Sequence, residues 1–242
     1  MSDQIKLSVI IPAHNEAKRI RRTILDIDKY LGKQDYDSEI IVVDNASLDK
    51  TAQIAKKVKN TRAKIFVIQT PIAGKGHAVK LGVESAKGKY IMFMDADNAT
   101  PISEIEKFWP YLEKGIEVVI GDRYLDIKHR AKQPLFRAIL SRGSNLLIQT
   151  VLIPHIHDTQ AGFKAFAGFA AKEIFKLIRI TGFAFDMELL AIALQLSYRI
   201  KAVPIVRDQE GGSTVGASAF ISSLRDLFII KWNALTGKYS TK

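Results

Sequence analysis

Short apolar segments alternate with helical segments through the first half of the chain, and this alternation restricts the possible folds. Continuous apolar runs of about five residues are typical of strands that are buried on both faces of a sheet. Such runs occupy residues 7–11, 39–43, 64–68 and 90–94, and apolar residues at helical spacing occupy residues 17–31, 47–59 and 74–86. The sequence therefore predicts an α/β fold, with a mostly parallel central sheet and helices on both faces.

The second half of the chain is less regular, but it continues without a linker, a repeat or a low-complexity tract. We predict strands at residues 117–121, 163–166 and 200–206, and helices at residues 141–153, 172–178, 186–196 and 219–235. A chain of 242 residues can bury a sizeable core without disulfides, and this chain has no cysteine. One domain over residues 1–242 is the simplest organisation, and thiolate chemistry and cysteine-ligated metals are excluded.

Basic residues outnumber acidic ones, and the excess lies mostly in the second half. The formal net charge is +11; residues 1–120 hold 19 basic and 16 acidic side chains, and residues 121–242 hold 17 and 9. An anionic partner is therefore expected to meet the second half, and nucleic acid, anionic lipid and phosphorylated substrates are the candidates. No apolar run reaches the ~18 residues that a membrane-spanning helix needs. We expect the chain not to cross a bilayer, although it could lie on one.

Polar residues directly follow the predicted strands, where open α/β sheets bind their ligands. Three Asp-x-Asp triplets occur, at residues 26–28, 35–37 and 95–97, and about one is expected by chance in this composition. Only the pair Asp95 and Asp97 follows a buried strand. Two carboxylates at that place suit a hard, oxygen-ligated cation, Mg²⁺ or Mn²⁺. The alternative is a pair that caps the next helix.

Several motifs, in a fixed order, resemble glycosyltransferase family 2, whose members share the GT-A nucleotide-diphospho-sugar transferase fold. The first half contributes SVIIPAHNE at residues 8–16, IVVDNASLDKT at 41–51, GKGHAV at 74–79 and YIMFMDADNAT at 90–100. The second half contributes VIGDR at 119–123, DTQAGFKAF at 158–166, FDMELL at 185–190 and EGGS at 210–213. Within the family the resemblance is greatest to the dolichyl-phosphate β-glucosyltransferases, followed by the dolichol-phosphate mannose synthases. Asn45 departs from the family pattern, which usually has a second acidic residue there.

The resemblance implies a donor half in about residues 1–121 and an acceptor half in about residues 122–242. Asp97 is expected to bind the metal ion, and Asp95 to contact the ion or the ribose. Asp44 is expected to bind the nucleobase, and Lys75 to approach the diphosphate or the base. The other expected nucleotide-sugar-binding residues are Pro12, Ala13, Asn15, Glu16, Gly76 and Ala96.

A basic stretch, residues 123–142, is the predicted acceptor side, with six basic residues and one acidic residue. Arginine suits bidentate phosphate recognition, although a solvated basic loop is the alternative. Asp158 and Gln160 are expected to shape the pocket for the sugar and the acceptor. The residues expected to contact a lipid phosphate are Arg123, Arg137, Ser141, Arg142 and Ser213.

The acceptor determines which catalytic groups are needed. A phosphate monoester is already anionic near neutral pH, so positioning and charge neutralisation suffice, and Asp97 and Arg123 are the expected catalytic residues. A glycan hydroxyl needs a carboxylate base, for which Asp186 is the only good candidate. The resemblance implies inversion at the anomeric carbon by a single displacement.

We therefore predict a metal-dependent hexosyltransferase acting on dolichyl or polyprenyl phosphate, with glucose from UDP-glucose favoured and mannose from GDP-mannose next. A family 2 enzyme acting on a glycan hydroxyl is the first alternative. A non-catalytic module that binds nucleotide or membrane is the alternative of another class. Nucleic-acid binding is not expected, because Tyr124 and Phe136 are the only Tyr, Phe or Trp side chains in the basic stretch.

The last apolar segment, residues 219–235, is predicted to form a helix with basic residues among apolar ones. It fits either a buried core helix or a helix at a membrane surface. With a lipid-linked acceptor, the second possibility makes the protein cytoplasmic and peripheral on the cytoplasmic face of a membrane. It also leaves room for a membrane-protein partner.

Overall fold

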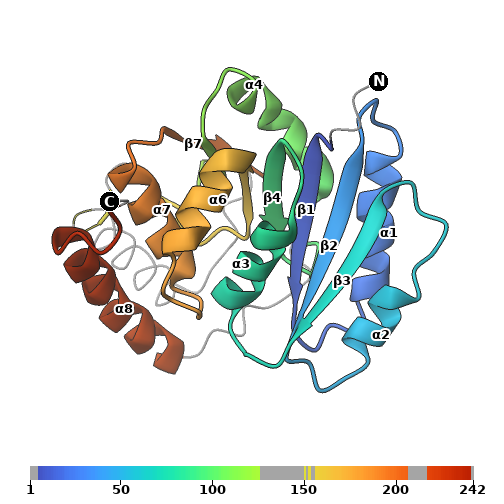
Figure 1. Ribbon diagram of the computed structural model, residues 1–242, viewed down its shortest axis with the longest axis horizontal. Helices are drawn as coiled ribbons and strands as arrows, with labels where there is room; N and C mark the ends of the chain where they lie inside the picture. The colour runs from blue at the N-terminus through green and yellow to red at the C-terminus, as the bar shows by residue number, and fades with distance from the viewer. Residues whose placement is uncertain (1–4, 126–149, 151, 154–155, 207–216, 241–242) are drawn as a thin grey trace.

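The computed structural model describes residues 5–125, 150, 152–153, 156–206 and 217–240, with the backbone alone for residues 217–224. Its described strands form one seven-stranded sheet in the order β3-β2-β1-β4-β6-β5-β7 (Figure 1). The strands are β1 (Leu7–Ala13), β2 (Ser38–Asn45), β3 (Lys64–Thr70), β4 (Tyr90–Met94), β5 (Val118–Asp122), β6 (Phe163–Ala167) and β7 (Ile200–Pro204). The helices are α1 (Ile20–Leu31), α2 (Thr51–Lys56), α3 (Lys75–Ser85), the 3₁₀ helix η1 (Ile102–Lys107), α4 (Trp109–Leu112), α6 (Gly168–Leu177), α7 (Phe185–Gln195) and α8 (Ala217–Leu235).

The sheet is mostly parallel, as the sequence predicts. β1 pairs in parallel with β2 and β4, β2 with β3, and β5 with β7. β6 runs antiparallel to both of its neighbours, β4 and β5. The chain order also reverses beside β1, because β2 and β3 lie on one side of it and β4 on the other. Open α/β sheets bind ligands at such a reversal, outside the carboxyl ends of the strands.

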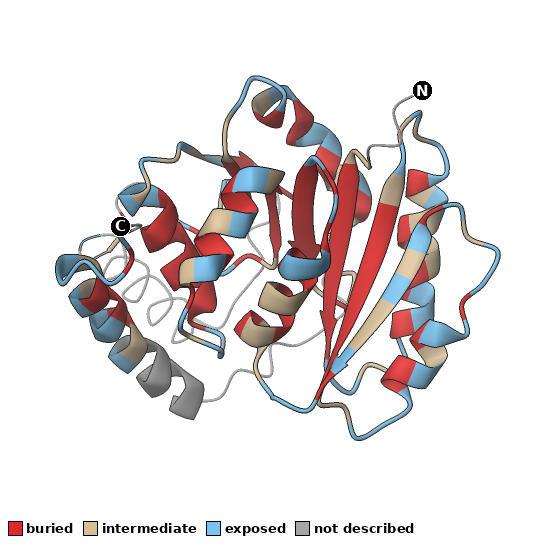
Figure 2. Ribbon diagram, in the orientation of Figure 1, coloured by how far each residue is buried: buried red, intermediate tan, exposed pale blue. Residues whose placement is uncertain are grey.

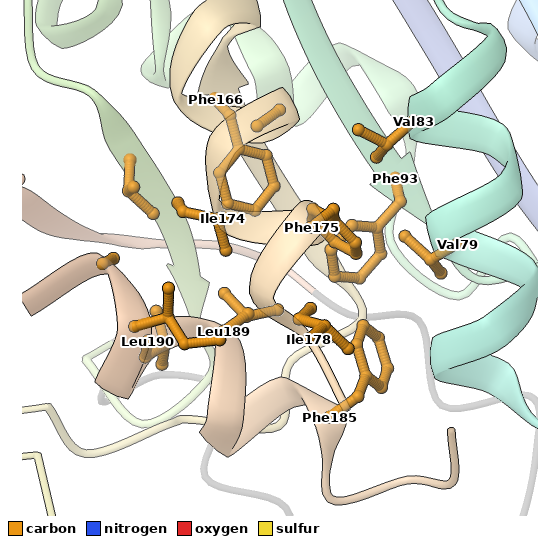
Figure 3. Close-up of a cluster of buried hydrophobic side chains, with 14 of the residues drawn as sticks. Val79, Val83, Phe93, Phe166, Ile174, Phe175, Ile178, Phe185, Leu189 and Leu190 are labelled. Atoms are coloured by element: carbon orange, nitrogen blue, oxygen red, sulfur yellow. The ribbon is translucent and has the colours of Figure 1, made fainter. Parts of the chain in front are cut away.

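Both faces of the sheet are covered, because successive strand residues point to opposite faces. Ile10 packs in the cluster with α3, α6 and α7, whereas Val9 and Ile11 pack in the cluster with α1, η1 and α4. The strands β1, β2 and β4 are buried along nearly their whole length (Figure 2). Aromatic rings join β4, β6, α6 and α7 on the first face, and they are Phe93, Phe166, Phe175 and Phe185 (Figure 3).

The observed elements agree with the predicted ones in type, with a few differences. β1 and β2 extend further than predicted, so that Ala13 and Asn45 still belong to strands. η1 and α4 were not predicted, because Pro101 and Pro110 interrupt the helical pattern, although proline fits the first turn of a helix. The predicted helix at residues 141–153 lies mostly outside the described residues. Its end is wrong: the buried Ile153 is not helical, as expected for a residue that precedes a proline.

The C-terminal helix α8 is buried in the core along one face only. Leu227 and Ile230 are fully buried against the rest of the core, whereas Phe228 and Trp232 are 59% and 64% exposed. One face of the helix is therefore core and the other is open. Within the described part of the chain, no helix has the length and apolar character that crossing a membrane requires.

Candidate active site

The strands β1, β2 and β4 end at one edge of the sheet, and the residues that follow them gather there. Asp95 and Asp97 come directly after β4. Arg123 follows β5 and reaches the same place. These three residues lie in one pocket, which we call the strand-end pocket, lined by Asp95, Asp97, Ala99, Thr100, Arg123, Ala161, Gly162 and Ile205. The structure thus brings together the two predicted metal ligands and one predicted acceptor residue.

Asp95 is held from two directions. The ammonium of Lys75 lies 2.7 Å from its Oδ1, and its backbone N–H donates to the carbonyl of Gly162 at 3.1 Å. A Cβ added at Gly162 would lie only 2.0 Å from Oδ2 of Asp95. The residue at position 162 must therefore lack a side chain for this carboxylate to keep its place.

Lys75, the first residue of α3, faces several carboxylates. Burial of its side chain lowers the pKa of the ammonium, but Asp95, Asp186 and Asp97 together raise it above its usual value. The side chain is only 16% exposed. Lys75 therefore carries a fixed positive charge beside the strand-end pocket at neutral pH, where it can meet an anionic group.

Arg123 is fixed by a buried carboxylate. Its Nε and Nη2 donate to Oδ2 and Oδ1 of Asp158 at 2.6 and 2.8 Å, and its backbone N–H donates to Oδ2 at 3.1 Å. Burial alone would raise the pKa of Asp158, but Arg123 holds it below its usual value. Asp158 was predicted to shape the sugar and acceptor pocket. In the structure its side chain is only 2% exposed, so it meets the strand-end pocket through Arg123 alone.

A second buried pair lies behind the pocket. Lys164, the second residue of β6, is fully buried, and its Nζ lies 2.5 Å from Oδ1 of Asp186 and 2.6 Å from the carbonyl of Ala161. Burial lowers the pKa of Lys164, and Asp186 opposes this shift. Asp186, the candidate base, is thus already bound to a cation. Lys164 also fixes the backbone next to Gly162, which in turn contacts Asp95.

The ends of β2 and β3 lie on the side of β1 that is opposite to β4. Asp44 is 5% exposed, and its Oδ2 accepts from Nε2 of Gln69 at 3.3 Å. Its Oδ1 is buried and has no hydrogen-bond partner among the described residues. Asn45 accepts from the backbone N–H of Gly74 through Oδ1 at 3.0 Å. Asn45 therefore holds the loop before α3, through a hydrogen bond that the carboxylate of an acidic residue could also accept.

The turn after β1 is held by hydrogen bonds to the turn after β2. Asn15 has a positive φ of 55°, its backbone N–H donates to Oγ of Ser47 at 2.9 Å, and its Oδ1 accepts from the N–H of Leu48 at 2.8 Å. Nδ1 of His14 lies 2.6 Å from the carbonyl of Asn45. Because a carbonyl only accepts, Nδ1 carries the proton. The predicted nucleotide-binding residue Asn15 thus lies in a turn that hydrogen bonds join to the turn after β2.

The glycines before and within α3 allow close packing against the segment before α7. Gly74 has a φ of 141°, and a Cβ there would lie 2.5 Å from the carbonyl of Thr181. A Cβ at Gly76 would lie 2.6 Å from Cβ of Phe185. Gly76 was predicted to be a nucleotide-sugar-binding residue. Its absent side chain is already explained by this packing.

The comparison with protein families decides the identity at family level. Residues 8–175 match the family model described as "Glycosyl transferase family 2". The chain belongs to glycosyltransferase family 2. The strand-end pocket lies within or directly beside this matched segment, since only Ile205 of its lining residues falls outside it.

Curated relatives match nearly the whole length of this family 2 chain. Proteins named dolichyl-phosphate beta-glucosyltransferase are 32% identical in Dictyostelium discoideum, 34% in Mus musculus and 34% in Saccharomyces cerevisiae. The matches cover 99%, 98% and 98% of this chain and 78%, 78% and 77% of those proteins, respectively. The predicted resemblance is confirmed at this level.

Solved structures confirm the predicted GT-A fold. Glucosyl-3-phosphoglycerate synthase from Mycobacterium tuberculosis, in complex with uridine-diphosphate, superposes with a TM-score of 0.68 at 20% identity, covering 95% of this chain and 80% of that chain. The same enzyme in complex with Mn²⁺, UDP-glucose and phosphoglyceric acid superposes with a TM-score of 0.67 at 18% identity, covering 97% and 80%. At such identities the likeness shows the fold alone.

The residues of the strand-end pocket fit part of a divalent metal site. Asp95 and Asp97 offer carboxylate oxygens, the ligand type that Mg²⁺ and Mn²⁺ prefer. Among the described residues, no group of three or more His, Cys, Asp or Glu side chains could hold a metal ion. Mg²⁺ commonly keeps several waters and takes further oxygens from substrate phosphates. The site therefore fits an ion that binds together with a nucleotide diphosphate.

The remaining predicted site residues differ in burial, and four of them lie outside the described residues. Pro12 and Ala13 are buried at the end of β1, and Ala96 is buried between the two aspartates. Glu16 binds Arg19 through two hydrogen bonds, at 2.7 and 3.0 Å. Gln160 is exposed in a turn beside Ala161. Four predicted acceptor residues lie outside the described residues, namely Arg137, Ser141, Arg142 and Ser213.

Sequence reasoning missed Gly162, Lys164 and Gln69. The first two lie inside the DTQAGFKAF motif, shortly after the assigned Asp158 and Gln160. A lysine among apolar strand residues could have signalled a buried ion pair, since an unpaired buried ammonium is very costly. Gln69 gave no such signal, because it reads as an ordinary polar strand end.

Proposed function

We propose that this family 2 enzyme transfers glucose from UDP-glucose to dolichyl or another polyprenyl phosphate, with inversion at the anomeric carbon. The observation that carries the proposal is the meeting of Asp95, Asp97 and Arg123 in one pocket. The relatives that match nearly the whole chain are named for glucosyl transfer to dolichyl phosphate, which supports this choice of sugar and acceptor.

The donor half, residues 1–121, binds the nucleotide sugar. Asp97 and Asp95 hold Mg²⁺ or Mn²⁺, which neutralises the charge that develops on the departing diphosphate. Lys75 adds a fixed positive charge beside Asp95, and Asp44 accepts from the nucleobase. The Mycobacterium tuberculosis enzyme of the same fold was solved with Mn²⁺ and UDP-glucose, which supports a metal and a uridine nucleotide here.

The acceptor half, residues 122–242, positions the lipid phosphate. Arg123 offers a guanidinium whose direction is fixed by Asp158, so little conformational entropy is lost when a phosphate binds. Arg137, Ser141, Arg142 and Ser213 are proposed to make further contacts with this phosphate. The guanidinium orients one phosphate oxygen toward the anomeric carbon.

The chemistry needs one displacement. An oxygen of the lipid phosphate attacks the anomeric carbon with its electron pair, the bond from that carbon to the diphosphate breaks, and UDP leaves with those electrons. The products are a glucosyl-phospho-lipid and UDP. No proton must be removed from an anionic phosphate, which suits a site whose candidate base, Asp186, is paired with Lys164.

The open face of α8 supports attachment to a membrane surface. Apolar side chains lie there among basic ones, the arrangement that favours anionic lipid surfaces. The exposed apolar members are Phe228, Ile229, Trp232 and Leu235, and the basic residues are Arg225 and Lys231 on the helix and Lys238 just after it. We propose that this face contacts the cytoplasmic side of the membrane that carries the lipid phosphate.

The test compares acceptors. The protein is mixed with Mn²⁺, UDP-glucose labelled in the sugar, and polyprenyl phosphate, polyprenol or an oligosaccharide. Labelled product is expected with the phosphate alone, and Asp186→Asn should retain part of this activity if it folds, as thermal unfolding can check. Labelling of the oligosaccharide that disappears in Asp186→Asn would instead assign the enzyme to hydroxyl acceptors.

A further inference from the structure

Asp44 and Gln69 are direct neighbours at the ends of two parallel strands. They are register partners in the β2–β3 pairing, so their side chains leave the sheet on the same face. Nε2 of Gln69 donates to Oδ2 of Asp44 at 3.3 Å. The other oxygen of this carboxylate, Oδ1, is buried without a partner among the described residues. A buried acceptor without a partner is costly, which indicates that a ligand donor completes it.

The orientation of the Gln69 amide is set by Lys56, the last residue of α2. Nζ of Lys56 lies 2.6 Å from Oε1 of Gln69. An ammonium only donates, so the amide oxygen must face Lys56 and the amide NH₂ must face Asp44. The chain Lys56–Gln69–Asp44 therefore presents a carboxylate with one occupied oxygen and one available oxygen.

We infer that Gln69 is a positioning residue that makes the nucleobase site select uracil over guanine. The inference rests on the proposed function, in which Asp44 binds the base. Uracil offers one ring N–H, at N3, which the available Oδ1 of Asp44 can accept. Guanine offers two adjacent donors, N1–H and the 2-amino group, which pair best with both oxygens of a carboxylate. Oδ2 already accepts from Gln69. A carboxylate oxygen can accept a second hydrogen bond, but the Gln69 NH₂ is itself a donor and crowds another donor on that oxygen, so one guanine donor stays unpaired.

The preference for uracil over guanine comes from the guanine donor that stays unpaired in the complex with GDP. A buried donor without an acceptor loses its hydrogen bonds to water and gains none, which costs more than an average hydrogen bond contributes. Hydrogen bonds to charged groups are among the stronger ones, so the preference should reach about tenfold or more in dissociation constant. Methylation of N3 in the uracil ring should weaken binding by a similar factor.

The test measures nucleotide binding by calorimetry on the whole chain with Mn²⁺ present. The ligands are UDP, GDP and N3-methyluridine diphosphate. The variants are Gln69→Met, which keeps the length of the side chain and removes the amide, and Gln53→Met, which changes an exposed glutamine on α2 as a matched control.

The inference expects the wild type and Gln53→Met to prefer UDP over GDP by about tenfold or more. In Gln69→Met the preference should shrink, chiefly because GDP binds more tightly, while the thermal unfolding temperature stays near that of the control. Equal binding of UDP and GDP by the wild type, or an unchanged preference in Gln69→Met, would overturn this inference alone. Binding of neither nucleotide would overturn the proposed function and this inference with it.

Discussion

The ammonium of Lys75 lies 2.7 Å from Oδ1 of Asp95, and this ion pair joins the start of α3 to the end of β4. Because of this pair, a positive charge lies beside Asp95, one of the two carboxylates that are proposed to hold the metal. A cation that approaches Asp95 must therefore compete with Lys75. A diphosphate removes this competition, because it offers Lys75 another anionic partner while it supplies oxygens to the metal.

We predict that Lys75→Met separates metal binding from nucleotide binding. Without Lys75, Mn²⁺ alone should bind several-fold more tightly, because Asp95 loses a competing cation and the charge beside the site becomes more negative. UDP in the presence of Mn²⁺ should bind about tenfold more weakly, because a charge-assisted contact to the diphosphate is lost. Calorimetry with each ligand measures both effects.

The control for this prediction is Lys59→Met, which removes an exposed charge away from the strand-end pocket. It should leave both affinities nearly unchanged. Weaker binding of Mn²⁺ alone to Lys75→Met would show that Lys75 supports the metal site rather than competing with it.

A methyl group at position 162 should disturb the site more than the fold. In Gly162→Ala the new Cβ would overlap Oδ2 of Asp95, so the carboxylate must move away from its place beside the pocket. Binding of Mn²⁺ with UDP should weaken about tenfold to a hundredfold, as seen when groups that orient metal ligands are lost. Gly182→Ala is the matched control, because a Cβ there meets nothing within 4 Å. Equal nucleotide affinity in the two variants would contradict the assigned position of Asp95.

The pair Arg123 and Asp158 should make the stability depend on pH. Arg123 holds the pKa of Asp158 below its usual value, so the folded state binds the proton less readily than the unfolded state does. The stabilisation is fully present above the ordinary pKa of an aspartate, about 3.9, and is lost as the pH falls through the lower folded value.

Urea unfolding of the wild type and Asp158→Asn between pH 7 and pH 3 measures this contribution. At pH 7 the variant should be less stable by about 3 kcal/mol, because it leaves the Arg123 guanidinium without its carboxylate. The difference between the two proteins should shrink toward acidic pH. A difference that stays constant over this range would show that the charge of Asp158 is not what stabilises the fold.

The open face of α8 should bind anionic membranes. Trp232→Ser should reduce sedimentation with vesicles of anionic phospholipid by several-fold, since the indole ring buries a large apolar area at such surfaces. Phe169→Ser on α6 is the control, because Phe169 is also 64% exposed but lies on another helix. An equal loss in both variants, or no binding by the wild type, would contradict a membrane role for α8.

Much of the fold could be predicted from the sequence, because strands buried in a parallel sheet have short, continuous runs of apolar residues. Residues 90–94 are the clearest case, since the observed strand has those same bounds. The antiparallel insertion of β6 between β4 and β5 could not be predicted, because strand order depends on pairings between distant segments. η1 and α4 were not predicted for a different reason, because Pro101 and Pro110 interrupt the helical spacing of apolar residues.

In the candidate site, too, local features could be predicted and pairings between distant residues could not. Asp95 and Asp97 were predicted because they follow a buried strand, and Asp44 was predicted from the family resemblance. All three lie at strand ends on one edge, because parallel strands end there together. The partners that orient the charged side chains were not predicted: Asp158 lies 35 residues after Arg123, and Asp186 lies 22 residues after Lys164. No local pattern records such a pair.

Glucosyl transfer to a lipid phosphate is measured most directly as product formed from UDP-glucose and a short-chain polyprenyl phosphate with Mn²⁺. We expect a glucosyl-phospho-lipid and UDP in equal amounts, and no product once the metal is chelated. In Asp97→Asn the rate should fall by roughly a hundredfold or more, because charge on the leaving diphosphate is no longer stabilised. Transfer of mannose from GDP-mannose in preference to glucose, or an Asp97→Asn variant as active as the wild type, would contradict this expectation.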